Sequence, residues 1–433
     1  MFEAPSKTIE RHHWNSLYLT SAFCLIVMTL AVGTQPLYLR SVLGVSPEVA
    51  GTINANIMVL AETLELFVVG AVGYLSDRFG RVRIMALGFI VAGIGALMAP
   101  FSSVISQALG GDGLLFYYLA RLVLAVGIGA IWPQVTTLAG DYTSTANRSR
   151  LMANNAFMMA FGKTLVYVVL MQIPLHAGVV LTMLLISLTA FAGAGLSRFH
   201  LIDVAPRLHQ SSIPWREIWM LLRTQSRLRL CFATSFLARS DMVITALFLM
   251  LWYVYFADIL GVTDTAAAAR GGLMIGFAGV VVMVSIPIWK IVMYRYGRVL
   301  AILVGLALSA MGFISMGLVG NPFDWFILLP VALTAAGQAG CFVAPQVLTV
   351  DVSPPNILGS VLGASNVVGG IGIIFFVQVG GFLFDTLGPT APFIFVGIAN
   401  ALVLIYAIWV HKDGDTMTLT TNDLYPIFLD LKE

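Results

Sequence analysis

Charged side chains are scarce in this sequence. Lysine and arginine number 23 and aspartate and glutamate 21, so these four types make up 10% of the 433 residues, whereas about 25% is typical of soluble domains. Hydrophobic residues make up 59%, and apolar runs recur from Leu17 to Val410. The shortage of charge excludes most soluble folds, and the recurring runs indicate a membrane protein with many crossings rather than a single anchor.

The motifs of several enzyme classes are also absent. The sequence contains no His-Glu-x-x-His, Gly-x-Ser-x-Gly or Walker-type phosphate loop, which argues against a metalloprotease and against direct use of ATP. Its three cysteines, Cys24, Cys231 and Cys341, lie in or beside apolar runs without the spacing of a metal site or a disulfide framework. We therefore expect no enzyme activity, no cofactor, no bound metal and no nucleic-acid partner.

The apolar runs are continuous and long enough for membrane-spanning helices. A helix needs about 20 mostly apolar residues to cross the hydrocarbon, and the strands of an outer-membrane barrel would alternate instead. We expect an all-α polytopic membrane protein with twelve transmembrane helices in two six-helix bundles. The expected spans are residues 15–38, 51–73, 84–104, 114–139, 150–172, 177–197, 229–256, 271–293, 299–319, 325–350, 357–383 and 391–410.

The longest hydrophilic segment, residues 198–228, separates the two halves of the chain. Its length and its arginine content predict a central cytoplasmic loop. We expect residues 1–197 to form the N-terminal bundle, residues 229–410 the C-terminal bundle and residues 411–433 a cytoplasmic tail.

The distribution of basic residues predicts the orientation. With both termini in the cytoplasm, 18 Lys and Arg lie on that side and 2, Arg40 and Arg270, on the other. The remaining three, Arg121, Lys163 and Arg239, lie within spans. By the positive-inside rule this split supports an even number of crossings in a bacterial inner membrane or a membrane derived from it.

Two short motifs occur once in each half, at separations of 212 and 217 residues. Duplicated bundles are typical of transporters, so the paired motifs predict two related halves. The first pair is Trp-Pro-Gln-Val at 132–135 before Asp141 and Ala-Pro-Gln-Val at 344–347 before Asp351, and the second is Asp-Arg-Phe-Gly-Arg at 77–81 and Tyr-Arg-Tyr-Gly-Arg at 294–298.

These motifs carry a resemblance to a known family. Residues 73–83, Gly-Tyr-Leu-Ser-Asp-Arg-Phe-Gly-Arg-Val-Arg, resemble the signature loop of the major facilitator superfamily between its second and third spans. Arg121 with the glycines of residues 127–129 is similar to the family's second motif, although Ala125 stands where its first glycine is usual. Residues 381–389 before the last span resemble another frequent family feature. The resemblance covers nearly all of the chain.

The resemblance implies a secondary transporter in which two bundles rock about a central site. Its signature loop would then act as a gate, for which Gly73 allows close backbone approach and Gly80 allows a tight turn. Asp77, Arg78 and Arg81 are expected to pair with helix ends and charges of the neighbouring bundle while the cytoplasmic side is closed. The alternative is that these arginines merely satisfy the positive-inside rule.

Charges inside the spans are the candidates for substrate binding or proton coupling. Each costs roughly 2.5 to 3.5 kcal/mol on insertion scales, so such residues usually have a partner or water. Arg239 and Asp241 are two apart on a helix and point about 200° from one another, so we expect one of them to pack against another helix. The six candidates are Glu62, Glu65, Arg121, Lys163, Arg239 and Asp241.

The two glutamates are three residues apart and share one helix face. We expect Glu62 or Glu65 to balance Arg121 or Lys163 within the N-terminal bundle, and one carboxylate to exchange protons as the cavity opens. A nearby cation and burial act in opposite directions on a carboxyl group, so breaking such a pair can couple protonation to conformation. Permanent structural ion pairs are the alternative.

The sequence predicts a secondary active transporter of a small solute or ion that is coupled to protons, contacts membrane lipid and works as a monomer. The balance of three acids and three bases leaves open whether the solute is an anion, a cation or a metal. Residues 239–241 followed by residues 251–253 resemble a bacterial subgroup that includes iron-handling transporters of the magnetosome membrane. A non-transporting assembly or receptor protein on the same fold is a further alternative.

Overall fold

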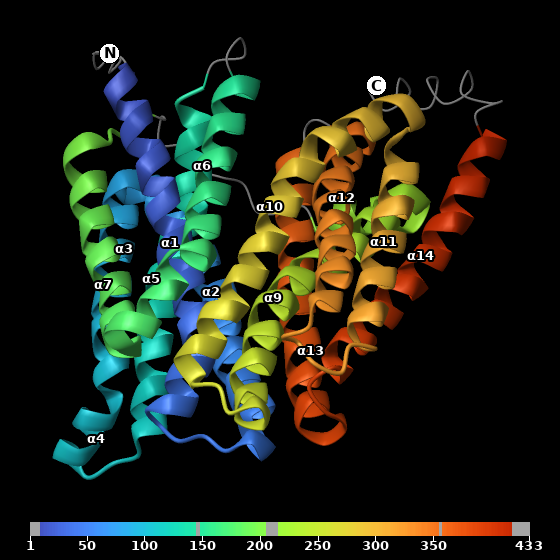
Figure 1. The fold of residues 1–433 in the computed structure, drawn as a ribbon. Helices are drawn as coiled ribbons and strands as arrows, with labels where there is room; N and C mark the ends of the chain where they lie inside the picture. The colour runs from blue at the N-terminus through green and yellow to red at the C-terminus, as the bar shows by residue number, and fades with distance from the viewer. Residues whose placement is uncertain (1–8, 144–147, 205–214, 355–356, 418–433) are drawn as a thin grey trace, which may run out of the picture.

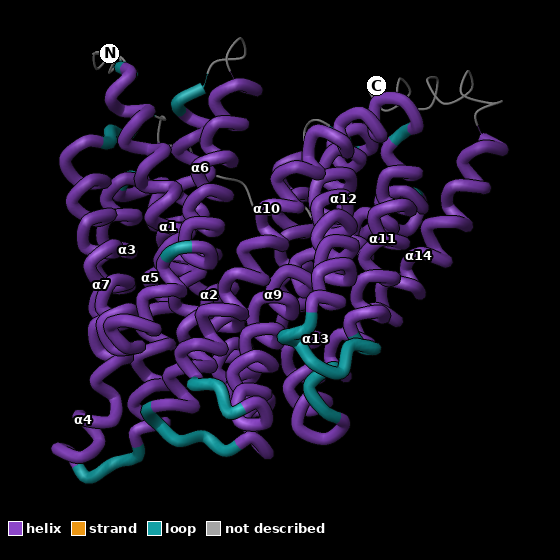
Figure 2. The backbone as a smooth tube through the Cα atoms, viewed as in Figure 1, coloured by secondary structure: helices purple, strands orange, loops and turns teal. Residues whose placement is uncertain are grey.

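In the computed structural model the described part of the chain consists of helices joined by loops, and it contains no strand (Figures 1 and 2). The structure describes residues 9–143, 148–204, 215–354 and 357–417. The helices are α1 (Arg11–Ser41), α2 (Ala50–Phe79), α3 (Arg81–Met98), α4 (Ser102–Leu109), α5 (Gly113–Asp141), α6 (Arg148–Val168), α7 (Ile173–His200), α8 (Trp215–Thr224), α9 (Ser226–Leu260), α10 (Asp264–Tyr296), α11 (Arg298–Met316), α12 (Leu328–Val352), α13 (Leu358–Leu387) and α14 (Ala391–Met417).

The helices account for twelve membrane crossings. Eleven stretches of the described residues are long and apolar enough to span a membrane, and one of them, Asn154–His200, is 47 residues long. This stretch contains most of α6 and all of α7, so it supplies two crossings at about 20 residues each. The prediction of an all-α polytopic membrane protein is confirmed.

The connection between the halves differs from the expected loop. Helix α7 continues to His200, and α8 occupies Trp215–Thr224 within the segment expected to be irregular. Helix α8 is amphipathic: Ile218 is buried in a small cluster with Leu228 and Val361, whereas its tryptophans are exposed. At the other end of the chain, α14 extends to Met417 into the expected tail.

The two halves pack against each other through a few long helices. We call α1–α7 the N-terminal half and α9–α14 the C-terminal half; α2 packs on α13, α6 on α10 and α1 on α9 between them. Both chain termini lie at one end, here named the terminal end, and the α1–α2 and α13–α14 connections lie at the opposite, distal end (Figure 1). The positive-inside prediction assigns the terminal end to the cytoplasm.

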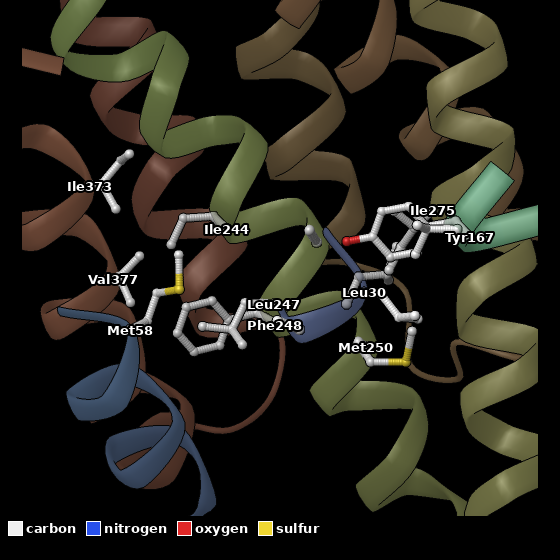
Figure 3. Close-up of a cluster of buried hydrophobic side chains, with 14 of the residues drawn as sticks. Leu30, Met58, Tyr167, Ile244, Leu247, Phe248, Met250, Ile275, Ile373 and Val377 are labelled. Carbon is white, nitrogen blue, oxygen red and sulfur yellow. The ribbon is translucent and has the colours of Figure 1, made fainter. Parts of the chain in front are cut away.

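An apolar cluster fills the contact between the halves (Figure 3). Its members come from three helices of each half, and all of them are buried. The cluster includes Leu30, Met58 and Tyr167 from the N-terminal half and Ile244, Leu247, Phe248, Met250, Ile275, Ile373 and Val377 from the C-terminal half. It separates the distal end from the terminal end with packed side chains.

The predicted relation between the halves is confirmed by matching helix contacts. In the N-terminal half, a Cβ added at Gly127 of α5 would lie 2.3 Å from the backbone nitrogen of Ala92 in α3. In the C-terminal half, a Cβ added at Gly337 of α12 would lie 2.3 Å from the backbone nitrogen of Ser309 in α11. Both helix pairs therefore depend on the absence of a side chain at the equivalent position.

Gly127→Val and Gly337→Val should each destabilise the protein, because the new side chain meets backbone that cannot move aside. Overpacking of this kind costs about 1–3 kcal/mol, so the melting temperature of the purified protein should fall by several degrees. Gly195→Val is the control, because a Cβ at Gly195 meets no atom within 4 Å. Unchanged melting temperatures in both test variants would contradict the close approach.

Candidate functional site

Polar contacts join the two halves at the distal end. Arg40 of α1 forms an ion pair with Asp258 of α9. The carboxylate of Asp385, near the end of α13, accepts hydrogen bonds of 2.7 Å from the backbone nitrogens of Gly51 and Thr52. The N–H groups in the first turn of α2 have no acceptor within the helix itself, and the helix dipole there also favours a negative charge. Asp385 therefore fastens the C-terminal half to the start of α2.

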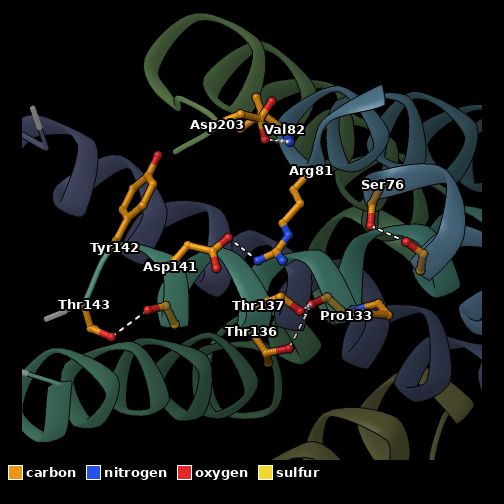
Figure 4. A network of polar contacts seen from close by, with 12 residues as sticks. Ser76, Arg81, Val82, Pro133, Thr136, Thr137, Asp141, Tyr142, Thr143 and Asp203 are labelled. Carbon is orange, nitrogen blue, oxygen red and sulfur yellow. Dashed lines mark hydrogen bonds and ion pairs between the residues drawn. The ribbon is translucent and has the colours of Figure 1, made fainter. Parts of the chain in front are cut away.

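Ion pairs at the terminal end lie within each half. Arg81 pairs with Asp141 in the N-terminal half (Figure 4), and the Nε of Arg298 lies 2.9 Å from Asp351 in the C-terminal half. These four residues belong to the two repeated sequence motifs, so the repeats produce equivalent contacts. The pairing of Arg81 with the neighbouring bundle is expected while the cytoplasmic side is closed; in this structure its ion pair with Asp141 lies within its own half.

The other residues of the signature loop agree only in part with expectation. Gly80 has a φ of 98°, which confirms the predicted tight turn between α2 and α3. The close backbone approach expected at Gly73 is wrong, since an added Cβ would meet no atom within 4 Å. Arg78 lies over the ring of Phe79, 5.4 Å from its centroid. The side chain of Asp77 lies outside the described part of the structure.

A second anchor lies beside this loop. Asp203, just after α7, accepts a hydrogen bond of 3.0 Å from the backbone nitrogen of Val82 in the first turn of α3. Nearby, Tyr142 exchanges two hydrogen bonds of 2.9 Å with the backbone of Ile202 (Figure 4 labels Tyr142 and Asp203). The segment after α7 is thereby fixed to the terminal end of the N-terminal half.

At mid-depth, an ion pair crosses between the halves. Oε1 of Glu62 in α2 lies 3.7 Å from an Nη of Arg239 in α9, and Arg239 also donates a 2.9 Å hydrogen bond to the backbone oxygen of Asn366 in α13. Glu62 is 4% exposed. Of the two glutamates expected to balance Arg121 or Lys163, Glu62 does not do so, because the face of α2 that carries it packs against the C-terminal half.

Glu65 lies one helical turn further along α2. Its backbone faces α5, where an added Cβ at Gly129 would lie 3.4 Å from the Cα of Glu65. Its carboxyl group is within electrostatic range of Glu62, Arg121 and Arg239. Glu65 is therefore a second carboxylate of α2, one turn from the Glu62–Arg239 ion pair and close to α5.

The two intramembrane cations of the N-terminal half, Arg121 and Lys163, have no ion pair with another described residue. Arg121 in α5 is 5% exposed, and its Nε has no hydrogen-bond partner in the described part of the chain. Lys163 in α6 is half-buried. Its neighbour Gly162 contacts α1, and Thr164 contacts Met283 of α10, so Lys163 lies on the face of α6 between α1 and α10.

Asp241 lies apart from these charges, inside the C-terminal half. It is fully buried and accepts hydrogen bonds from Oγ of Ser309 at 3.0 Å and from Nδ2 of Asn400 at 3.2 Å. This confirms that Arg239 and Asp241 point in different directions and that one of them packs among helices. Ser309 and Asn400 were not predicted, although an asparagine within an apolar span is itself a signal of interhelical hydrogen bonding.

A metal site does not emerge from the described residues, which contain no group of three or more His, Cys, Asp or Glu able to hold an ion. The polar groups at mid-depth are instead two carboxylates of α2, Arg239 and the two unpaired cations. Such an arrangement can bind a charged solute or exchange a proton.

Comparison with known proteins identifies the family. The family model described as Major Facilitator Superfamily matches residues 17–377 and 271–421. The chain belongs to the major facilitator superfamily. Members of this superfamily with solved structures share the fold at low sequence identity: the inward-open xylose transporter XylE from E. coli superposes with a TM-score of 0.70 at 15% identity, covering 91% of this chain and 95% of that one. The nucleoside transporter NupG has a TM-score of 0.70 at 14% identity, with 92% and 98% covered.

Closer relatives within the superfamily are magnetosome proteins. The chain is 56% identical over 410 residues to magnetosome protein MamH of Paramagnetospirillum magneticum, covering 95% of each chain. It is 43% identical over 405 residues to magnetosome protein MamZ of the same organism, covering 93% of this chain and 63% of MamZ. The resemblance to a magnetosome-type subgroup is therefore confirmed.

Removal of the Asp241 carboxylate should destabilise the C-terminal half. Asp241→Ala leaves the buried donors of Ser309 and Asn400 without an acceptor, at a cost of about 1–3 kcal/mol. The melting temperature of the purified protein measures this effect, and Asp324→Ala serves as an exposed control. A stable Asp241→Ala variant would show that the hydrogen bonds around Asp241 contribute nothing to folding.

Loss of the Asp385 charge should loosen the distal contact. Asp385→Asn weakens two charge-assisted hydrogen bonds to the start of α2, so the buried cluster should become accessible from the distal side. A cysteine introduced at Met58, which is 6% exposed, should react several-fold faster with a membrane-impermeant maleimide added from that side. Asp324→Asn is the matched control, and equal labelling in all variants would contradict the role of Asp385.

Proposed function

We propose that this protein is a secondary transporter that moves a small solute by alternating access, driven by protons, as a monomer in lipid with its terminal end in the cytoplasm. The ion pair between Glu62 and Arg239 is the observation that carries the proposal. It joins the halves at mid-depth, because Glu62 belongs to one half and Arg239 to the other. Rocking of one half against the other would therefore change the distance between these two side chains. A bacterial inner membrane, or a membrane derived from it, is the proposed location.

Proton coupling follows from the chemistry of this pair. A proton on Glu62 removes its attraction to Arg239 and lets the halves separate. Protonation would thus be tied to the opening of the distal end, because α2 and α9 belong to different halves.

The gate is proposed to consist of helix ends on α2 and α13. Residues 73–80 at the terminal end of α2 and residues 381–388 at the distal end of α13 share the spacing Gly-x-Leu-x-Asp-x-x-Gly. Asp385 holds the start of α2 while the distal end is closed. Asp77 occupies the equivalent position in α2, so it would hold the start of α13 when the terminal end closes.

The test measures proton movement in proteoliposomes with a pH-sensitive dye inside. Pools of organic anions, cations, sugars and divalent metals are added outside, and one pool should change the internal pH. With that pool, Glu62→Gln should reduce proton-driven uptake at least tenfold and leave solute exchange within twofold of the wild type, because exchange requires no net proton transfer. Glu48→Gln, at an exposed position outside the spans, is the control.

Normal proton-driven uptake in Glu62→Gln would remove this residue from the coupling mechanism. Silence of the wild-type protein towards every pool, with the protein folded and inserted, would favour the non-transporting alternative. In that alternative, neutralising substitutions at the mid-depth charges preserve both stability and function.

A second candidate is the transport of iron, as an ion or a complex, in the magnetosome membrane. The relatives MamH and MamZ support it, because both are named magnetosome proteins. The resemblance of residues 239–253 to iron-handling members points the same way. Uptake of iron in the same proteoliposomes, absent from protein-free vesicles, tests this candidate.

A further inference from the structure

Three buried polar atoms of α1 and α5 have no hydrogen-bond partner in the described part of the chain. They are Oε1 of Gln35, the hydroxyl of Tyr117 and Nε of Arg121. Gln35 and Tyr117 are fully buried, and Arg121 is 5% exposed. Buried polar groups are rarely left unpaired, so a cluster of them indicates a place that a polar ligand or water fills.

The three groups lie close together. The rings of Tyr38 and Tyr117 stack with centroids 5.1 Å apart, which fixes the level at which α1 meets α5. Gln35 precedes Tyr38 by three residues and Arg121 follows Tyr117 by four, and the two helices run in opposite directions. Both side chains therefore lie one helical turn from the stacked rings, on the side of the terminal end.

Two of the three groups can donate hydrogen bonds to a negatively charged group. The amide nitrogen of Gln35 donates a 3.1 Å hydrogen bond to Oδ1 of Asn54 in α2, so Gln35 contributes only an acceptor oxygen, which can receive a hydrogen bond from a hydroxyl or from water. Arg121 supplies planar N–H donors, and the hydroxyl of Tyr117 supplies another. The cluster thus contains a buried guanidinium with two polar groups beside it.

The charges around the cluster leave an excess of positive charge. Glu62 is neutralised by Arg239 of the other half, and Glu65 is the one further carboxylate among the six intramembrane charges of α2, α5, α6 and α9 outside the buried site of Asp241. Lys163 has no ion pair with a described residue. One turn away on the same face of α6, Tyr167 lies against Gly33 of α1, so Lys163 is on the α1 side as well.

We propose that Arg121 anchors the carboxylate or phosphate group of an anionic solute, with Tyr117 beside it and Lys163 as a second cation. A metal ion would accordingly be carried as an anionic chelate. This inference rests on the proposed transport function and adds the charge of the solute to it.

The experiment measures binding and transport separately on the full-length protein. Binding is read from the melting temperature in citrate, inorganic phosphate and ferric citrate, with tetraethylammonium and Fe²⁺ as cationic probes. At least one anion should stabilise the wild type, and Arg121→Gln and Lys163→Met should each weaken that binding at least tenfold. Arg121→Lys should recover part of it, since the charge is kept. Lys290→Gln, at an exposed position, should bind as the wild type does.

Tyr117→Phe distinguishes a loss of binding from a loss of folding, because it removes one hydroxyl and keeps the ring that stacks on Tyr38. It should weaken anion binding several-fold at an unchanged melting temperature without ligand. Folded Arg121→Gln with wild-type affinity would overturn the inference, as would a protein that responds to no anion.

Transport of the same probes into proteoliposomes distinguishes this inference from the proposed function. Anion uptake that is lost in Arg121→Gln supports both. Uptake of a cationic probe without any anion overturns the inference and leaves transport standing. Anion binding without any uptake supports the site and overturns transport.

Discussion

An isolated charge inside hydrocarbon is expensive, and this chain compensates its intramembrane charges in two different ways. Glu62 obtains its partner from the other half of the molecule, so its compensation depends on how the halves are arranged. Asp241 obtains neutral donors from helices of its own half, so its compensation is permanent. The ion pair of Glu62 thus links the two halves, whereas the hydrogen bonds of Asp241 link helices within one half.

The contacts between the halves at the distal end differ from the buried Glu62–Arg239 ion pair. Asp385 bonds to backbone N–H groups at the start of α2 rather than to a buried cation, and Arg40 and Asp258 pair where both are partly exposed. Contacts near water can be exchanged for water at little cost, so they can open and close. The apolar cluster between the halves is buried, and the polar contacts at the distal end hold the halves together in the arrangement observed.

The sequence predicts much of this fold because its signals are local. Apolar length predicts the crossings, and helical spacing predicts that Glu62 and Glu65 share a face and that Arg239 and Asp241 do not. The partner of Glu62 could not be predicted, because spacing within one helix does not say which distant helix lies opposite. The close backbone approach predicted at Gly73 is absent for a related reason, because such an approach depends on a neighbouring helix that the sequence around Gly73 does not specify. Helix α8 was missed because its amphipathic pattern spans ten residues within a polar segment.

The two halves are related in packing and in the ion pairs of the terminal end, and they differ in their charges at mid-depth. The Arg–Asp pairs and the glycine contacts recur at offsets of 217 residues between α3 and α11 and of 210 between α5 and α12. At those same offsets, Arg121 corresponds to Val331, and a shift of 217 places Gly279 at Glu62 and Val282 at Glu65. The glycines at helix contacts and the Arg–Asp pairs thus occur in both copies, whereas Glu62, Glu65 and Arg121 of the N-terminal copy have uncharged counterparts in the C-terminal copy. Duplication alone therefore does not account for the mid-depth charges, because they lie where the two copies differ.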